Sequence, residues 1–444
     1  MKTRSVTSWG RVSWPTHELL EIRSRHDRLP ASGEALLLPF GNGRSYGDSN
    51  LNPDGALLAT RRLDRSIAFD DERGLLTCEA GMLIADILQR FVPRGWFPAV
   101  TPGTMYVTVG GAIANDVHGK NHHCAGSFGN HVLRFELLRS DGSRRICSPT
   151  ENADWYAATI GGLGLTGLVT WAQIRLQRVA GPLIEAETLR FRSPGEFFEL
   201  SAQSAATHAY TAAWIDCAFG GKRLGRGLFE RGNHAPAHVD AALAAAAMRK
   251  AAERTRRVPL TPPLSLVNAL TLKAFNWAYF HRQRAERVRA LKHYRAFLYP
   301  LDAVLEWNRI YGPRGFFQYQ CLVPGDCALA NVRKLLDTIA SSGMGSPLAV
   351  LKQFGPMAPL GMLSFPAEGT TLALDFPNRG ERLERLFGAL DRIVLDAGGR
   401  LYPAKDARMG AAVFKAGYSE RERFAAYVDP RFSSAFWRRV AGNG

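Results

Sequence analysis

Cysteine is scarce in this sequence, and long apolar runs are absent. The six cysteines in 444 residues form no Cys-x-x-Cys pair, which excludes a small disulfide scaffold and offers no zinc-binding pattern. We expect reduced core thiols. They are Cys78, Cys124, Cys147, Cys217, Cys321 and Cys327.

Apolar runs are too short for a membrane-spanning helix, which needs roughly 18 consecutive residues. No signal peptide is evident in the first residues either. We therefore expect a cytoplasmic protein or one peripherally associated with the plasma membrane. With 46% hydrophobic and 22% charged residues, the composition is typical of a globular protein, and the length suits two or three domains.

Acidic residues are outnumbered, 40 against 56 Lys and Arg, which gives a net charge of +16. Much of the excess lies in segment 249–295, where only Glu253 and Glu286 are acidic and four large aromatic residues follow one another closely. This mixture suits an anionic membrane surface or nucleic acid, and a solvated helix face would show it too. The basic residues are Arg249, Lys250, Arg254, Arg256, Arg257, Lys273, Arg282, Arg284, Arg287, Arg289, Lys292 and Arg295.

The apolar spacing predicts an α+β protein with two unlike sheet-containing domains. Tight turns between short apolar runs predict strands within 54–85, and the pattern changes around 178–187. Further strands are expected at 132–138, 168–176 and 316–323. Helices are expected at 82–91, 152–160, 194–206, 239–252 and 381–397.

Gly162-Leu-Gly-Leu-Thr-Gly167 matches the dinucleotide string G-x-G-x-x-G. In a Rossmann fold that string follows a strand and opens a helix. Here a helical pattern precedes the glycines and a strand pattern follows them. We therefore expect no Rossmann site, although these glycines could line another cofactor.

Two other glycine-rich segments are more informative. In segment 37–48 an apolar strand enters a turn whose backbone N–H groups could hold phosphate oxygens. In segment 101–123 small residues could let the backbone approach a flat ligand, and four basic side chains follow. His122 and His123 would face opposite ways on a strand, so no metal site is expected.

Together these segments resemble flavin-dependent oxidoreductases of the vanillyl-alcohol oxidase/p-cresol methylhydroxylase superfamily, and within it the subfamily that oxidises polyprenyl-phosphoryl ribose. The motifs run along nearly the whole chain. They are Gly43-Arg-Ser-Tyr-Gly-Asp48, Thr101-Pro-Gly-Thr104, Val107-Thr-Val-Gly-Gly-Ala-Ile-Ala114, His118-Gly-Lys-Asn-His-His123, Ala125-Gly-Ser-Phe-Gly-Asn-His-Val132, Gly164-Leu-Thr-Gly167, Glu306-Trp-Asn308, Tyr311-Gly-Pro-Arg-Gly315, Phe317-Gln-Tyr-Gln320, Lys352, Phe354-Gly355, Asp375-Phe-Pro377 and Lys405-Asp406.

The resemblance implies a two-domain fold of the vanillyl-alcohol-oxidase type. Residues 1–182 and 399–444 would form the FAD-binding domain, and 183–398 an antiparallel-sheet cap domain for the substrate. Since the first glycine loop offers Arg44 and no histidine, the FAD would be non-covalent. The implied cofactor residues are Gly41, Asn42, Gly43, Arg44, Ser45, Tyr46, Gly47, Asp48, Thr101, Pro102, Gly103, Thr104, Gly110, Gly111, Ala112, Ala114, Asn115, His118, Gly119, Asn121, His122, Gly164, Gly167, Tyr402 and Lys405.

The implied reaction oxidises the 2′-hydroxyl of a polyprenyl-phosphoryl-β-D-ribose to the 2′-keto sugar, with hydride passing to flavin N5. This is the first half of an epimerisation to the arabinose form, in cell wall biosynthesis. Lys405 would stabilise the reduced flavin, and His118 is a candidate proton acceptor, with Tyr46 as the third catalytic residue. The implied substrate residues are Lys120, Trp214, Gln318, Gln320, Lys352, Phe354 and Thr371; Lys120 and Lys352 could pair with the phosphate.

A lipid-linked substrate favours a membrane surface, and not nucleic acid, as the partner of segment 249–295. A short-chain-dehydrogenase-type reductase would complete the epimerisation. An FAD-dependent oxidase of free alditols or aldonolactones remains the alternative within enzymes. Some members of the subfamily have cysteine where this chain has Ala373, so covalent inhibitors that need that thiol should fail here.

Overall fold

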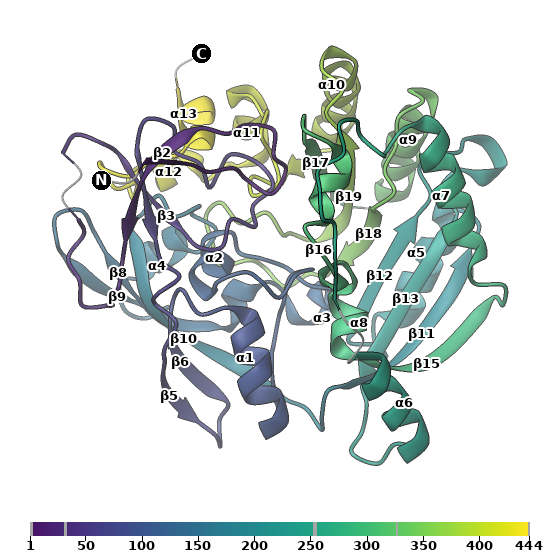
Figure 1. Cartoon of the computed structure of the whole chain (residues 1–444), viewed down its shortest axis with the longest axis horizontal. Coiled ribbons are helices and arrows are strands. Elements are labelled where there is room, and N and C mark those ends of the chain that lie inside the picture. Colours follow the sequence, from purple (N-terminus) through teal and green to yellow (C-terminus); the bar gives the residue numbers. More distant parts are fainter. Residues whose placement is uncertain (1–2, 31–32, 252–254, 326, 443–444) are drawn as a thin grey trace.

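The computed structural model describes residues 3–30, 33–251, 255–325 and 327–442. Figure 1 shows the N-terminal segments, in purple and blue, beside the yellow C-terminal helices, with the teal and green middle of the chain on the other side. Arg254 and Glu253 of the basic segment lie outside the described residues. No helix among the described residues is long and apolar enough to cross a membrane.

Two sheets form the N-terminal side. In the first, two parallel pairings join the strands in the order β2-β4-β3, and β1 adds antiparallel. In the second, antiparallel strands follow the order β5-β6-β10-β8-β9, and β7 pairs with β10. The strands are β1 (Thr3–Ser5), β2 (Thr16–Glu21), β3 (Leu37–Phe40), β4 (Ala56–Ala59), β5 (Ser66–Asp70), β6 (Leu75–Glu79), β7 (Trp96–Pro98), β8 (Val132–Leu138), β9 (Arg144–Cys147) and β10 (Leu168–Arg178).

The middle of the chain builds a larger antiparallel sheet, in the order β15-β11-β13-β12-β18-β19-β17-β20. A separate short pair joins β14 and β16 in parallel. The strands are β11 (Leu183–Phe191), β12 (Tyr210–Ile215), β13 (Gly227–His234), β14 (Arg256–Arg257), β15 (Arg287–His293), β16 (Val304–Leu305), β17 (Phe316–Val323), β18 (Ala349–Phe354), β19 (Gly369–Pro377) and β20 (Arg400–Leu401).

Helices pack around these sheets, and five short 3-10 turns lie between them within the described residues. The α-helices are α1 (Ile84–Phe91), α2 (Val109–Ala114), α3 (His122–Ala125), α4 (Ala153–Thr159), α5 (Pro194–Ser204), α6 (Ala241–Ala251), α7 (Ala269–His281), α8 (Tyr294–Leu298), α9 (Ala328–Ser341), α10 (Glu381–Asp396), α11 (Ala411–Gly417), α12 (Arg421–Ala425) and α13 (Ala435–Ala441). The 3-10 turns are η1 (Val92–Arg94), η2 (Phe128–His131), η3 (Gly221–Arg223), η4 (Pro300–Ala303) and η5 (Trp307–Tyr311).

The expected elements are confirmed, with ends that shift by a few residues. Helix α5 begins where its sequence provides a cap, because the Ser193 hydroxyl accepts from the Glu196 N–H and proline follows. The Gly162–Gly167 string lies between α4 and β10. The expected order of helix before and strand after these glycines is confirmed, so they do not have the strand-then-helix context of a Rossmann site.

Two expectations about individual residues are wrong. Cys124 and Cys327 are exposed, because α3 and the start of α9 place them at the surface, whereas the other four cysteines are buried. His122 and His123 lie on the short helix α3 and not on a strand. Their rings still diverge: His122 packs against Phe354, and His123 Nε2 bonds the carbonyl oxygen of His208.

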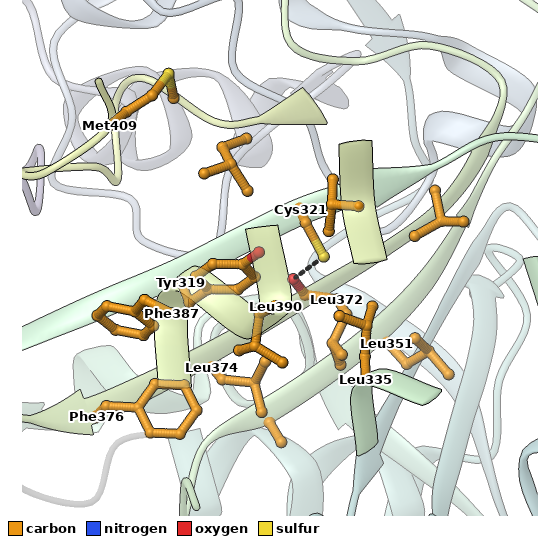
Figure 2. Close-up of a cluster of buried hydrophobic side chains, with 14 of the residues drawn as sticks. Tyr319, Cys321, Leu335, Leu351, Leu372, Leu374, Phe376, Phe387, Leu390 and Met409 are labelled. Atoms are coloured by element: carbon orange, nitrogen blue, oxygen red, sulfur yellow. Dashed lines mark hydrogen bonds between the residues drawn. The ribbon is translucent and has the colours of Figure 1, made fainter. Parts of the chain in front are cut away.

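The main hydrophobic core lies between the large sheet and helices α9 and α10. Figure 2 shows alternate residues of β17 and β19, among them Tyr319 and Leu374, meeting Leu335 and Leu390 from these helices. The same cluster continues into α11 and α13 through Phe414 and Phe436. The C-terminal segment is therefore part of one buried core with the large sheet, although it packs beside the N-terminal strands.

Candidate functional site

A cavity of about 590 Å³ lies between the N-terminal sheets and the large sheet. This volume falls within the range of small-molecule sites. Its walls come from segments far apart in the sequence: the glycine loop after β3, the loop before α2, the start of α2, β17, β18 and the turn after β20. Folding thus brings both glycine-rich segments, 37–48 and 101–123, to the wall of one cavity.

The glycine loop after β3 presents backbone donors to the cavity. Among the described residues, the N–H groups of residues 42–45 donate to no acceptor in the protein. Gly43 has a positive φ of 62°, which turns the backbone between its neighbours. Successive unpaired N–H groups in such a turn form an anion-binding nest. This end of the cavity therefore suits phosphate oxygens.

Orphaned polar side chains lie at the same end. Within the described part of the chain, Ser49 Oγ, both amide atoms of Asn50 and Nε of Arg44 are buried without a hydrogen-bond partner, and all three residues line the cavity. Such groups cost free energy unless a ligand or water pairs with them. The Arg44 guanidinium stacks over Trp9 at 4.3 Å, and burial lowers its pKa.

Helix α2 forms the next part of the wall. Its first turn is capped by Thr108 Oγ1, which accepts from the Gly111 N–H at 3.1 Å. A Cβ at Gly110 would lie 3.1 Å from the Ala80 Cβ, so a larger residue here would push α2 and Ala80 apart. Gly110, Gly111 and Ala114 of α2 line the cavity, so this wall carries no side chain larger than a methyl group, which suits a planar ring system.

A second part of the cavity, its polar end, is centred on His118. Lys352 Nζ lies 3.1 Å from its Nδ1, and Gln320 Nε2 lies 3.0 Å from its Nε2. Burial, followed by the charges of Lys352, His122 and Lys405, holds the pKa of His118 well below its usual value. The imidazole is therefore neutral at physiological pH.

Two further ionisable groups face each other beside Tyr46. Lys405 Nζ lies 3.8 Å from the centre of the Tyr46 ring, and burial lowers the pKa of Lys405 to about 8. Behind them, Gln318 Nε2 donates to Asp375 Oδ1 at 2.7 Å. Burial raises the pKa of Asp375 to about 7, partly offset by Gln318 and by Lys405.

Lys120 lines the cavity but already has protein partners. Its Nζ donates to Glu230 Oε2 at 2.7 Å and to the Phe297 carbonyl oxygen at 2.6 Å. Lys292 bonds the other oxygen of Glu230 at 2.6 Å. A phosphate would therefore have to compete with a carboxylate for Lys120, whereas Lys352 has no acidic partner among the described residues.

Most of the predicted site residues line this cavity. The predicted cofactor residues that do so are Gly41, Asn42, Gly43, Arg44, Ser45, Tyr46, Thr101, Pro102, Gly103, Thr104, Gly110, Gly111, Ala114, Asn115, His118, Gly119, Gly164, Gly167, Tyr402 and Lys405. The predicted substrate residues that do so are Lys120, Gln318, Gln320 and Lys352.

Eight predicted residues do not line the cavity, because each is turned toward protein. They are Gly47, Asp48, Ala112, Asn121, His122, Trp214, Phe354 and Thr371. Asp48 pairs with Arg439 at 2.6 Å, and a Cβ at Gly47 would overlap the Asp406 carbonyl oxygen. Trp214 Nε1 donates to the Pro347 carbonyl oxygen.

The positions of several of these residues indicate support of the wall. Asn121 donates to the Ala99 carbonyl oxygen, and Ala112 is fully buried within its own cluster. Phe354 packs between the rings of His118 and His122. Thr371 Oγ1 donates to the Cys321 carbonyl oxygen at 2.9 Å.

Segment 298–306, which the sequence analysis did not identify, forms another wall of the cavity. Tyr299 OH lies 2.6 Å from Thr101 Oγ1. Asp302 accepts from Thr104 Oγ1 at 2.7 Å and from the Met105 N–H at 2.8 Å. No local sequence pattern marks Tyr299 or Asp302, because their partners lie about two hundred residues earlier in the chain. The nearby Glu306-Trp-Asn308 motif was the one signal in the sequence that pointed to this segment.

The residues present fit a flavin dinucleotide. The nest and the orphaned polar atoms suit its diphosphate, and the small residues of α2 along the cavity suit its ring. The loop of residues 41–48 contains no histidine that could bond covalently to the ring.

Comparison with known proteins agrees with this fit. The family described as FAD binding domain matches residues 29–148. The chain is 35% identical to the decaprenylphosphoryl-beta-D-ribose oxidase of Mycolicibacterium smegmatis, over 99% of this chain and 97% of that protein. It is 34% identical to an uncharacterised protein of Streptomyces coelicolor, over 79% of this chain and 97% of the relative.

Other relatives match a smaller share of the chain. Cytokinin dehydrogenase 8 of rice is 30% identical over 33% of this chain and 30% of its own length. The expected superfamily is confirmed by the full-length relative together with the matched domain. The chain is an FAD-dependent oxidoreductase that belongs to the decaprenylphosphoryl-β-D-ribose oxidase family.

Proposed function

We propose that this enzyme oxidises the 2′-hydroxyl of a polyprenyl-phosphoryl-β-D-ribose to the 2′-keto sugar, with FAD bound without a covalent link. The observation that carries the proposal is the polar end of the cavity. There His118, Lys352 and Lys405 line the cavity together with two glutamines. Amides, amines and an imidazole match the hydroxyl groups of a sugar, and the relative named for a lipid-linked ribose spans the whole chain.

FAD in this cavity would supply the two-electron acceptor for the carbon-bound hydrogen. Lys405 would hold a positive charge at the wall and stabilise negative charge that develops there during oxidation. Gln318, fixed by Asp375, and Gln320, fixed by Thr371, would orient the sugar. The buried wall excludes bulk water from these contacts, which strengthens them.

Anaerobic mixing with polyprenyl-phosphoryl ribose tests the reaction. We expect the flavin absorbance to bleach with this substrate and the product to carry a ketone at C2′. Bleaching by free alditols or aldonolactones, with none by the lipid-linked sugar, would establish the alternative oxidase. The keto product would leave a reduction to a second enzyme, which we propose to be a short-chain-dehydrogenase-type reductase.

The proposed domain arrangement follows the boundaries 1–182, 183–398 and 399–444. Strands up to β10 precede the first boundary, and β11 opens the large sheet just after it. The C-terminal segment starts with β20 at the edge of the large sheet and then runs to the N-terminal side. There Asp429 accepts from Arg139 Nε at 3.2 Å, which supports its assignment to the FAD-binding part.

We also propose that the mouth of the cavity docks on an anionic membrane. Leu260, Leu264 and Leu270 are 77–79% exposed, and Trp277 on α7 is 54% exposed. Arg257, which lines the cavity, lies a few residues away. Exposed leucines beside arginine and lysine match a lipid surface, because the apolar groups gain burial and the cations meet phosphate groups.

The charge of this region is less uniform than its sequence implies. Arg287 and Arg289 both pair with Glu187, and Lys292 pairs with Glu230. Lys273 and Arg284, by contrast, have no acidic partner in the described part of the chain. We therefore assign membrane contact to α7 and the leucines before it, and not to β15.

Vesicle sedimentation tests this assignment. The wild type should bind vesicles that contain phosphatidylglycerol more tightly than zwitterionic ones, and salt should weaken the binding. Leu264→Asp with Leu270→Asp should reduce binding at least tenfold. Ile67→Asp, at an exposed position of β5, is the matched control and should bind as the wild type does. Equal binding by the double variant would refute the assignment.

A further inference from the structure

The hydrogen bonds around His118 restrict where its proton lies. Thr371 Oγ1 donates to the Cys321 carbonyl oxygen at 2.9 Å, so its lone pairs face Gln320, 3.2 Å away. The Gln320 side chain must therefore turn its NH₂ group toward Thr371, since a carbonyl oxygen there would face another acceptor. The second N–H of the same NH₂ group points at His118 Nε2.

This arrangement fixes the imidazole tautomer. His118 Nε2 accepts from Gln320, so a neutral ring carries its proton on Nδ1. That N–H faces Lys352 Nζ at 3.1 Å. An ammonium group has donors only, so this contact is a hydrogen bond only when Lys352 is a free amine. Three consecutive hydrogen bonds thus favour the neutral form of Lys352.

From this geometry we infer that Lys352 is the base that takes the proton of the sugar hydroxyl, and that His118 and Gln320 are its positioning residues. The inference rests on the proposed function. In the step, the O–H bond breaks and its proton forms a new N–H bond at Lys352 Nζ. The adjacent C–H bond breaks, its hydrogen leaves with two electrons to the flavin cofactor, and the sugar carbon becomes a carbonyl.

The charges around Lys352 agree with this role. Burial, followed by the charges of Lys120 and Lys405, lowers its pKa to about 7. His118 faces it as a neutral donor, and the nearby ring of His122 is neutral too because burial lowers its pKa to about 3. A base whose pKa lies near the working pH is well suited to proton transfer. His118 itself has no free lone pair, because its Nδ1 carries a proton and the lone pair of its Nε2 accepts from Gln320.

Phosphate binding is the competing role for Lys352, and it needs the opposite charge. Lys352→Arg keeps a cation and loses the free amine, so it separates the two roles. We expect Lys352→Arg and Lys352→Met to retain FAD and to slow flavin bleaching by about 10²–10⁴-fold. Lys334→Met, at an exposed position of α9, is the control and should bleach at the wild-type rate. Retention of the rate by Lys352→Arg would overturn the inference.

A second experiment does not depend on turnover. In FAD-loaded enzyme labelled with ¹⁵N-histidine, the imidazole shifts of His118, identified by their loss in His118→Gln, should report the Nδ1–H tautomer at pH 8. The Nε2–H tautomer would leave Nδ1 as an acceptor that an ammonium group at Lys352 can bond, so the hydrogen bonds would no longer favour the free amine. That result would overturn the inference even if no lipid-linked sugar is oxidised. A wild type that shows the expected tautomer but no bleaching would instead refute the proposed function.

Gln320→Glu gives a third, directional test. Its carboxylate would accept from His118 Nε2–H, free Nδ1 as an acceptor and stabilise the ammonium form of Lys352. We expect the acid limb of the bleaching rate, normalised to the maximum of each protein, to move to higher pH by about one unit or more. An unmoved limb would contradict the positioning role of Gln320.

Discussion

At the scale of single residues, three lysines reach one cavity, and their surroundings give them different charges. Lys120 has Glu230 as a partner, Lys405 lies near Asp375 and over Tyr46, and Lys352 meets His118. Because burial disfavours the charged form, a lysine without an acidic partner loses its proton first. The site can therefore hold a cation and a free amine close together at the same pH.

Lys405→Met tests the role of the positive charge at Lys405. Removing the charge should leave FAD bound and slow flavin bleaching by about 10²–10³-fold, the usual effect of losing one electrostatic group at a reaction centre. Stopped-flow absorbance with the lipid-linked sugar measures the rate, and the flavin content of the purified variant is the control. A variant that bleaches at the wild-type rate would remove Lys405 from the reaction.

The pH dependence of flavin bleaching follows from the same two groups. Lys352 gains a proton as the pH falls through about 7, which removes the base. Lys405 loses its proton as the pH rises through about 8, which removes the cation. We expect a bell-shaped profile with its maximum between these values, reporting the pair and not either residue alone. Rates that rise steadily to pH 10 would contradict a charged Lys405.

The cost of burying Lys352 adds a prediction about stability. A lysine whose pKa is lowered in the folded state binds fewer protons than in the unfolded state, so stability rises with pH between about 7 and 10.5. Lys352→Met should remove this cost and raise the unfolding temperature at pH 7, with a smaller gain at pH 10. Calorimetry of the flavin-loaded proteins measures the unfolding temperatures. A lower unfolding temperature for Lys352→Met than for the wild type at both pH values would contradict the predicted cost of burying Lys352.

At the scale of secondary structure, α7 carries large apolar side chains outward and depends on its ends for stability. Asn268 Oδ1 accepts from the N–H groups of Leu270 and Thr271, each at 3.1 Å, and Thr271 Oγ1 accepts from the Asn268 N–H. Such a reciprocal cap satisfies donors that a helix start leaves unpaired. The cap therefore matters more here than in a helix held by packing on most sides.

Asn268→Ala should destabilise α7 by about 1 kcal/mol, the usual cost of losing an N-cap. Faster amide hydrogen exchange in residues 269–275 and weaker vesicle binding should follow. Asn268→Asp keeps an oxygen acceptor and should behave as the wild type does. Unchanged exchange in the alanine variant would show that tertiary contacts, and not the cap, hold the helix.

At the scale of the whole molecule, the C-terminal segment ties the two sides of the cavity together. Asp429 is 1% exposed and accepts from Arg139 Nε and from the N–H groups of Ser140 and Arg431. Arg439 bonds Asp48 beside the glycine loop and also lies 3.3 Å from Asp406. Contacts at the end of the chain therefore set the position of the nest near its beginning.

Asp429→Ala should leave Arg139 without its buried carboxylate and destabilise the protein by about 3–5 kcal/mol. Looser attachment of the C-terminal segment should also reduce flavin retention during gel filtration. Asp141→Ala, at an exposed position of the same region, is the control. A variant that keeps both its unfolding temperature and its flavin would show that the segment is held by apolar packing alone.

The sequence by itself determined the elements and the family. Periodicity is a local property, so α1, β8, α10 and β17 could be placed from their own residues. The glycine motifs indicated a phosphate nest and a close backbone approach, because each needs particular residues at particular spacings. Their resemblance to a flavoenzyme family then named the cofactor.

Only the tertiary structure decided which residues touch the cavity and in which charge state. Tyr299 and Asp302 brace a loop about two hundred residues earlier, a pairing that leaves no local signal. Lys120 and Lys352 are the same residue type, so the sequence does not distinguish them. Their surroundings differ in the structure, because Lys120 meets a carboxylate and Lys352 an imidazole N–H. Burial and partners set a pKa, and both exist only once distant segments have packed together.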